Sequence, residues 1–242
     1  MIYPIYIGSI SVAVILIIIT VYAEIRVRVT YSKYSEITTS QAMPAYQFAR
    51  IVLDSLGLQN IQIIKIGGEL TDYYDHKRQV IALSDGIYDS TSVAALGVVA
   101  HEIGHAIQYK EGYAFIKIKQ VLYPIANFTS RFMWVILIAG IIGSFCVSPA
   151  LSYNFFSYFL LGYVVFYGMS FLFALITLPI EKNASKRALA MLKETNTLND
   201  GELTQAKSVL DAAALTYVAS LIVSLVYFLR MLIIFANFTK KK

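Results

Sequence analysis

The chain has 242 residues, of which 57% are hydrophobic and 14% are charged, and its mean hydropathy is +0.63. Soluble domains are usually about 45–50% apolar and about 25% charged, so this composition excludes a disordered chain and argues against an ordinary cytosolic enzyme. The net charge is +5 at pH 7, and the single cysteine, Cys146, excludes an intrachain disulfide framework and a cysteine-based zinc cluster.

Four mostly apolar stretches without a charged residue predict membrane-spanning helices. Each has the roughly 18–20 residues that a helix needs to cross about 30 Å of hydrocarbon. We expect about four transmembrane helices, with three spans and one re-entrant or interfacial segment as the alternative. The first stretch is expected to be a retained anchor, because a signal peptide needs a basic start and no side chain before Glu24 is charged. In chain order the stretches cover residues 5–23, 132 to about 151, about 155 to 180, and 212–229.

Two polar segments, residues 24–131 and 181–211, lie between the spans and carry Lys and Arg at their membrane flanks. Positive flanks favour the cytoplasmic side, so we expect both segments in the cytoplasm and both chain ends outside. Arg230 and the lysines at 240–242 run against this orientation. Because both segments are nearly neutral, the surplus charge forms a membrane-flanking tail, and we expect no nucleic-acid partner. The flanking cations are Arg26, Arg28, Lys33, Lys117, Lys119, Arg131, Lys182, Lys186, Arg187 and Lys207.

The larger polar segment is long enough for one small domain. Apolar residues at helical spacing predict helices, and runs rich in β-branched residues predict strands. In chain order these are a helix at 41–56 that stops at Gly57, two strands at 61–66 and 79–83 on either side of a polar loop at 71–78, and a helix at 93–107 with capping residues at 89–92.

The last of these helices contains the motif His101-Glu102-Ile103-Gly104-His105. Residues four apart lie on one helical face, so both imidazoles can bind one ion, and Glu102 is close enough to hold a water on it. Zinc lowers the pKa of such a water to about 7, and a carboxylate can take its proton before attack on a carbonyl. The motif predicts metal-assisted amide hydrolysis; the alternative is two buried structural histidines. The presence of a glycine inside this helix, at position 104, is explained if another element approaches closely there.

A catalytic zinc site needs a third protein ligand, and Glu181 is the best candidate. It begins a helical stretch, 181–192, at the cytoplasmic end of the third span, where the small residues Ala184 and Ala188 would let a second helix approach. Asp211 is an open alternative, and a surface carboxylate at a helix start is the plainer interpretation of Glu181. The carboxylates that fit less well are Glu111, Glu194, Asp200 and Glu202.

Two other roles stay open. An oxyanion would need a second stabilising group besides the metal, and His76, Tyr73, Tyr74 and Arg187 are candidates. The strand at 79–83 either pairs with an extended substrate or lies in the core.

Several motifs together resemble the zinc membrane neutral metallopeptidases of the YugP-like type, over nearly the whole chain. The active site is also similar to that of HtpX-type membrane peptidases, in which a Glu-x-x-Ala-Asp segment supplies the third ligand. The resemblance implies a zinc endopeptidase in which Glu181 joins His101 and His105 as a metal ligand, with Ser185 where the HtpX type has aspartate. The motifs that carry it are Val98-Val99-Ala100-His101-Glu102-Ile103-Gly104-His105-Ala106-Ile107-Gln108, Leu70-Thr71-Asp72-Tyr73-Tyr74-Asp75, Ala82-Leu83-Ser84 and Leu178-Pro179-Ile180-Glu181-Lys182-Asn183-Ala184-Ser185.

We therefore expect a mainly α, polytopic membrane protein with a small α+β zincin-like cytoplasmic domain. It should bind one Zn²⁺ through His101, His105 and Glu181, use Glu102 as the catalytic base, and cleave unfolded or membrane polypeptides in quality control or processing at the plasma membrane. A catalytically inactive zinc-binding scaffold in the bilayer is the alternative. The expected parts are transmembrane helix 1 at 1–23, the cytoplasmic zincin-like segment at 24–131, transmembrane helices 2 and 3 at 132–180, the cytoplasmic segment with the third ligand at 181–211, and transmembrane helix 4 with the basic tail at 212–242.

Overall fold

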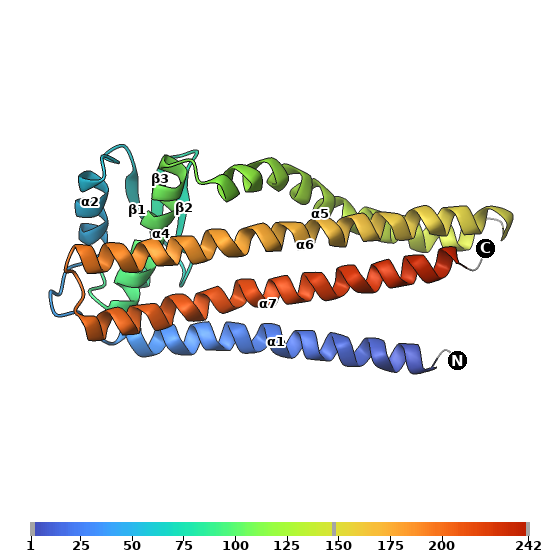
Figure 1. Ribbon diagram of the computed structural model, residues 1–242, viewed down its shortest axis with the longest axis horizontal. Coiled ribbons are helices and arrows are strands. Elements are labelled where there is room, and N and C mark those ends of the chain that lie inside the picture. The colour runs from blue at the N-terminus through green and yellow to red at the C-terminus, as the bar shows by residue number, and fades with distance from the viewer. Residues whose placement is uncertain (1–2, 147–148, 241–242) are drawn as a thin grey trace. The chain divides into compact units, whose positions relative to one another are not determined.

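The computed structural model describes residues 3–146 and 149–240, and most of them are helical (Figure 1). This confirms the mainly α expectation. The chain divides into two compact units, one formed by Met1–Ile116 with Pro179–Thr216 and the other by Lys117–Leu178 with Tyr217–Lys242. The described elements are α1 (Tyr3–Ser35), α2 (Ala45–Ser55), β1 (Gln62–Ile66), β2 (Tyr73–Asp75), β3 (Val80–Ser84), α3 (Asp85–Tyr88), α4 (Val93–Lys110), α5 (Ala114–Cys146), α6 (Pro149–Glu194) and α7 (Asp200–Thr239).

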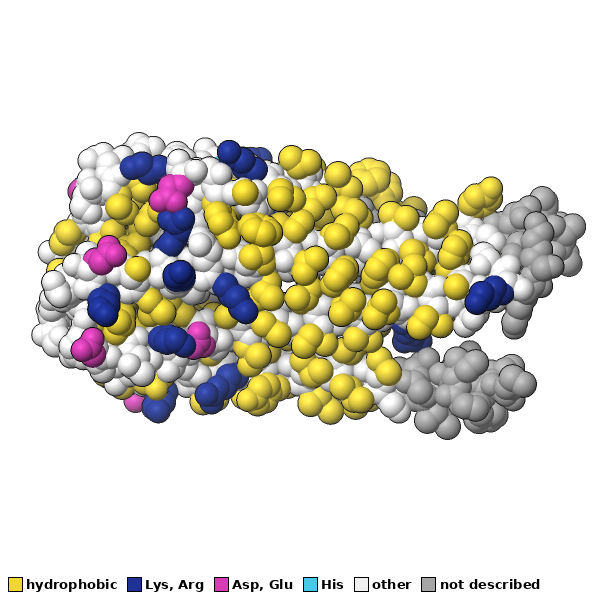
Figure 2. All heavy atoms as spheres, viewed as in Figure 1, with side chains coloured by type: hydrophobic (Ala, Val, Ile, Leu, Met, Phe, Trp, Pro, Cys, Tyr) yellow, Lys and Arg dark blue, Asp and Glu magenta, His cyan; other side chains and the backbone are white. Residues whose placement is uncertain are grey.

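Three stretches among the described residues are long and apolar enough to span a membrane. They are Ile10–Ser35 in α1, Phe156–Glu194 in α6 and Asp200–Thr239 in α7, and they overlap three of the expected spans. The other expected span, 132 to about 151, runs from α5 across positions 147–148 and so lies partly outside the described residues. Figure 2 shows hydrophobic side chains crowded on the exposed surface of the long helices, as a lipid-facing surface requires.

The first unit contains a sheet of three described strands in the order β1-β3-β2. β1 pairs with β3 in parallel, and β2 pairs with β3 in the antiparallel direction. The central strand β3 is buried along its whole length. Both of its edges are therefore occupied, so the idea that an extended substrate adds to this strand is wrong and the core interpretation holds. β2 was missed, because it lies within the stretch expected to be a loop.

The helix α4 is the centre of the first unit, where it packs against α1, α2, α3, β2 and β3 (Figure 1). Its start is fixed by Ser92, whose side chain accepts a hydrogen bond from the backbone N–H of Ala95 at 3.2 Å, as the sequence predicts. The predicted stop of α2 at Gly57 is also confirmed, since this residue has a φ of +69°. Large buried core residues of the unit include Phe48, Leu53, Ile81, Leu83, Leu96, Ile103 and Leu192.

The loop before β2 is tied to the end of β3 by Asp72. One carboxylate oxygen of Asp72 accepts the backbone N–H of Ser84 at 2.7 Å, and the other accepts the Ser84 hydroxyl at 3.0 Å. Burial raises the pKa of Asp72, and the two hydrogen bonds from Ser84 oppose that shift. Two of the sequence motifs, 70–75 and 82–84, therefore meet in one contact.

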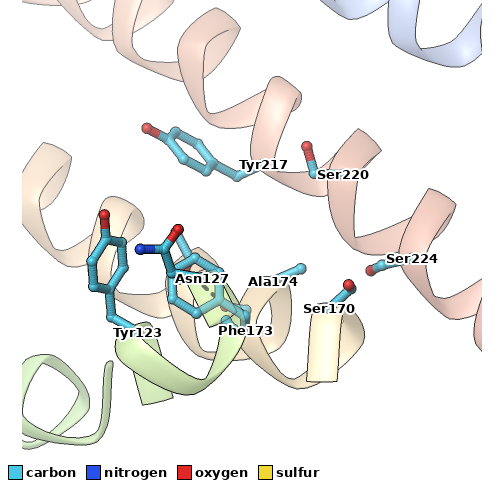
Figure 3. A pocket seen from close by; sticks show the side chains of 10 residues that line it. Tyr123, Asn127, Ser170, Phe173, Ala174, Tyr217, Ser220 and Ser224 are labelled. Atoms are coloured by element: carbon cyan, nitrogen blue, oxygen red, sulfur yellow. Dashed lines mark hydrogen bonds between the residues drawn. The ribbon is translucent and has the colours of Figure 1, made fainter. Parts of the chain in front are cut away.

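The second unit holds a cavity of about 530 Å³ among α5, α6 and α7 (Figure 3). The hydroxyls of Ser170, Thr177 and Ser224 line it but donate to backbone carbonyls of their own helices, at 2.8–3.0 Å. These three hydroxyls therefore have hydrogen-bond partners within their own helices. The other lining residues are Tyr123, Ala126, Asn127, Phe173, Ala174, Tyr217 and Ser220.

Candidate metal centre

Two histidines of α4 and one glutamate of α6 converge within the first unit. The Nε2 atoms of His101 and His105 lie 3.3 Å and 3.4 Å from the same oxygen, Oε2 of Glu181. The two imidazole rings are nearly perpendicular, with centroids 4.7 Å apart. One ligand atom from each of the three residues lies within 4.8 Å of the others. The sequence spacing of four brings the histidines onto one face, and α6 supplies the third group.

This donor set fits zinc. Two imidazole nitrogens and one carboxylate oxygen form a usual three-residue set for a catalytic zinc ion. With bonds of about 2.0–2.2 Å, ligand atoms on a tetrahedral ion stand roughly 3.3–3.5 Å apart. The two N–O separations, 3.3 Å and 3.4 Å, fall in this range. Burial would raise the pKa of Glu181, but its contacts with the two imidazoles outweigh burial and hold the pKa well below its ordinary value.

Glu102 lies beside these three groups, on the buried side of α4. Burial raises the pKa of its carboxyl, and the charges of His105 and His101 offset this only in part. Burial would lower the pKa of His105, yet the carboxylates of Glu181 and Glu102 raise it. The charges of these four residues therefore influence one another. The carboxylate of Glu102 is the one that does not belong to the group formed by His101, His105 and Glu181.

Gly104 lets α4 and α6 approach each other at this point. A Cβ atom at position 104 would lie 2.7 Å from the backbone oxygen of Ala184 and 3.2 Å from its carbonyl carbon. Both Ala184 and Ala188 are completely buried. The expected close approach of another element at Gly104, and the expected role of small residues after Glu181, are confirmed. The contact places Glu181, one helical turn before Ala184, beside the histidines.

Each histidine also has a partner on its other ring nitrogen. Nδ1 of His105 lies 3.0 Å from Oε1 of Gln108, a side chain that is 0% exposed. Nδ1 of His101 lies 3.2 Å from the hydroxyl of Ser185. Partners of this kind orient metal-binding imidazoles. Ser185 is therefore the residue of α6 that contacts the outer ring nitrogen of His101.

We expect Ser185→Ala to weaken zinc binding about tenfold, because the His101 ring loses the hydroxyl that orients it. The dissociation constant would be measured by competition with a zinc-binding dye on the purified protein. Ser208→Ala is the matched control, since its hydroxyl is exposed and bonds only to the backbone oxygen of Thr204. Equal zinc affinity for Ser185→Ala and wild type would contradict the role.

The other candidate carboxylates are engaged elsewhere. Asp211 is exposed and pairs with Lys207 on the same helix. Glu111 pairs with Arg187 at 2.6 Å, and Glu202 caps the start of α7 through Asn199. Glu194 and Asp200 are exposed.

The candidate oxyanion groups also have neighbours of their own. His76 stacks on Tyr109 with centroids 4.2 Å apart, and Tyr74 meets the same ring edge-on at 5.7 Å. Tyr109 follows His105 by one helical turn, so these rings stand next to the metal centre along α4. Tyr73, in β2, is exposed. Arg187 contacts Asn183 and Glu111.

Gln108 and Asn183 were not assigned a role from sequence, although both lie inside the recognised motifs. Gln108 follows His105 by three residues on the same helix, a spacing that brings side chains together. Its buried amide donates to the Ile180 carbonyl at 2.8 Å and to Oδ1 of Asn183 at 2.9 Å. The helical spacing was available in the sequence, whereas the partners on α6 were not.

The chain is similar to a family of zinc metallopeptidases and to one membrane protease. A family model described as "Putative neutral zinc metallopeptidase" matches residues 9–236, a range that includes His101, His105 and Glu181. The "Putative membrane protease YugP" of Bacillus subtilis (strain 168) is 35% identical over 217 residues, which cover 89% of this chain and 91% of that protein. No solved structure matches the chain.

Proposed function

This chain belongs to the neutral zinc metallopeptidase family, and from that membership we propose that it is a membrane-embedded zinc endopeptidase. The observation that carries the proposal is the convergence of His101, His105 and Glu181, with Glu102 beside them. The three converging residues would hold one Zn²⁺. A set of three protein ligands leaves a position for water, whereas structural zinc sites are closed by four.

Glu102 is the proposed general base. When bound, zinc supplies a Lewis acid that polarises the scissile carbonyl and acidifies a water molecule. The carboxylate of Glu102 accepts a proton from that water and later delivers it to the nitrogen of the leaving amine. His101 and His105 present their Nε2 atoms toward the centre, and Ser185 and Gln108 hold the opposite ring nitrogens.

We further propose that four helices cross the plasma membrane, including the stretch at 132–151, and that the metal centre faces the cytoplasm. The cationic flanks of segments 24–131 and 181–211 support this orientation.

The substrates would be unfolded or membrane polypeptides, and the role would be quality control or processing of such chains. The relative's printed name, a membrane protease, is consistent with this assignment.

The third ligand provides the direct test of the zinc site. We expect Glu181→Ala to lose zinc affinity by more than about a hundredfold, because even changes outside the ligand set cost about 10–100-fold. Asp211→Ala is the matched control, since Asp211 is exposed and pairs with Lys207. Zinc content and dissociation constants would be measured on the detergent-solubilised protein, together with hydrolysis of unfolded casein.

The results separate three outcomes. Zinc loss in Glu181→Ala but not in Asp211→Ala, with casein hydrolysis by the wild type, supports the peptidase. Zinc loss in Asp211→Ala alone would overturn the ligand assignment. Stoichiometric zinc without hydrolysis would leave the inactive zinc-binding scaffold as the function.

A further inference from the structure

A network of hydrogen bonds runs to the metal centre from an ion pair between the residue directly after α4 and a residue of α6. It begins at Glu111, whose carboxylate lies 2.6 Å from a terminal nitrogen of the Arg187 guanidinium. Nε of Arg187 donates to Oδ1 of Asn183 at 2.8 Å, and the same oxygen accepts from the Gln108 amide at 2.9 Å. Gln108 then reaches Nδ1 of His105 at 3.0 Å.

Each hydrogen bond in this network has a fixed donor and a fixed acceptor. A guanidinium has only donors, so Asn183 must turn its oxygen, and not its amide nitrogen, toward Arg187. Gln108 faces two acceptors, Oδ1 of Asn183 and the Ile180 carbonyl, so both of its amide hydrogens are used. The remaining atom, Oε1, is the one that faces His105.

These donor and acceptor roles decide which ring nitrogen of His105 carries the hydrogen. Because Oε1 of Gln108 can only accept, Nδ1 of His105 must donate. The neutral ring then has its lone pair on Nε2, which lies 3.4 Å from Oε2 of Glu181. The Ser185 hydroxyl beside His101 can donate or accept, so that contact forces no such choice.

We propose that Arg187 and Asn183 are positioning residues which act through Gln108 to keep the hydrogen of His105 on Nδ1 and so leave Nε2 free to bind the metal. The inference deepens the proposed function, because it assumes that His105 is a metal ligand. It moves Arg187 from a candidate oxyanion group to a residue that acts from outside the reacting centre. Zinc binding then depends on Arg187, a side chain that contacts Asn183 and Glu111 and not the three residues that would bind the metal.

Nitrogen NMR on the metal-free protein tests the proposal directly. The chain has three histidines, so ¹⁵N-histidine labelling gives few ring signals, and long-range ¹H–¹⁵N spectra distinguish the Nδ1–H from the Nε2–H form. In the wild type at alkaline pH we expect His105 in the Nδ1–H form. Asn183→Leu and Arg187→Met should give a mixture of both forms and weaken zinc binding about tenfold.

Two variants make the test specific. Asn183→Asp keeps an oxygen that accepts from both Arg187 and Gln108, and should keep the wild-type form of His105. Lys186→Met removes the neighbouring positive charge on the exposed side of α6, and should leave the tautomer and the zinc affinity unchanged. Neither readout requires turnover, so a protein with the expected tautomer and zinc affinity but no hydrolysis would contradict only the proposed peptidase.

The proposal is overturned if the His105 tautomer stays unchanged in both Asn183→Leu and Arg187→Met. It is also overturned if Lys186→Met alters the tautomer as much as Arg187→Met does, because charge alone would then be the cause. Should Asn183→Leu fail to fold, Asn183→Asp and Arg187→Met still decide between the outcomes.

Discussion

Glu102→Gln should reduce peptide hydrolysis about a thousandfold while leaving zinc bound, within the range of 10²–10⁴ that general bases contribute. The substitution keeps the shape of a buried side chain but removes its ability to accept a proton. Zinc should remain, because Glu102 is outside the set formed by His101, His105 and Glu181. The measurement is kcat on an unfolded casein substrate, with zinc content determined on the same sample.

Glu194→Gln is the matched control for this experiment. Glu194 is an exposed glutamate at the end of α6, so the same chemical change should alter neither rate nor zinc content. A Glu102→Gln protein that retains zinc and hydrolyses casein at the wild-type rate would contradict the general-base role. Loss of zinc in this variant would show that Glu102 supports the ligands instead.

Gly104→Ala should weaken zinc binding and lower the stability of the protein. The added Cβ would meet backbone atoms of Ala184 at 2.7–3.3 Å, and a backbone cannot turn aside as a side chain can. Overpacking of this kind costs about 1–3 kcal/mol, which equals or exceeds the gain of about 1 kcal/mol from alanine's helix propensity. The separation of α4 and α6 also draws Glu181 away from both histidines, so we expect zinc affinity to fall at least about tenfold.

Gly97 provides a matched control on the same helix. A Cβ there would lie 3.6 Å from Cβ of Ala206, an ordinary van der Waals contact, so Gly97→Ala should be neutral or raise stability by up to about 1 kcal/mol. Both variants would be compared by thermal unfolding of the metal-free protein and by zinc competition. A Gly104→Ala protein that is more stable and binds zinc as tightly as wild type would refute the close-contact explanation.

Local chemistry made much of the fold predictable. Ser92 precedes an apolar helix and caps it, and Gly57 ends α2 because a left-handed residue is needed there. The two histidines are four apart on a helix, so their shared face follows from helical geometry alone. Glu181 could be proposed as their partner because the small residues after it allow a close contact between helices, which the structure shows at Gly104.

Features that depend on long-range contacts were not predictable in the same way. β2 has only three residues, too few to show an alternating pattern, and its pairing with β3 gives it a strand conformation. The short helix α3 was also missed, since four residues carry no periodic pattern. The partners of Gln108 on α6 come from a segment more than 70 positions away, and no local pattern could indicate them.

Pro179 lies inside α6, two residues before Glu181 and at the first residue of the segment that belongs to the first unit. Proline has no backbone N–H, so the helix lacks one internal hydrogen bond there and bends more easily than elsewhere. Glu181, Asn183 and Ser185 all follow this weak point. A helix that spans a bilayer adjusts its tilt or bends when the bilayer thickness changes, and in α6 the weakest position for such a bend lies before Glu181. We therefore expect bending of α6 to begin on the N-terminal side of the residues that converge with His101 and His105.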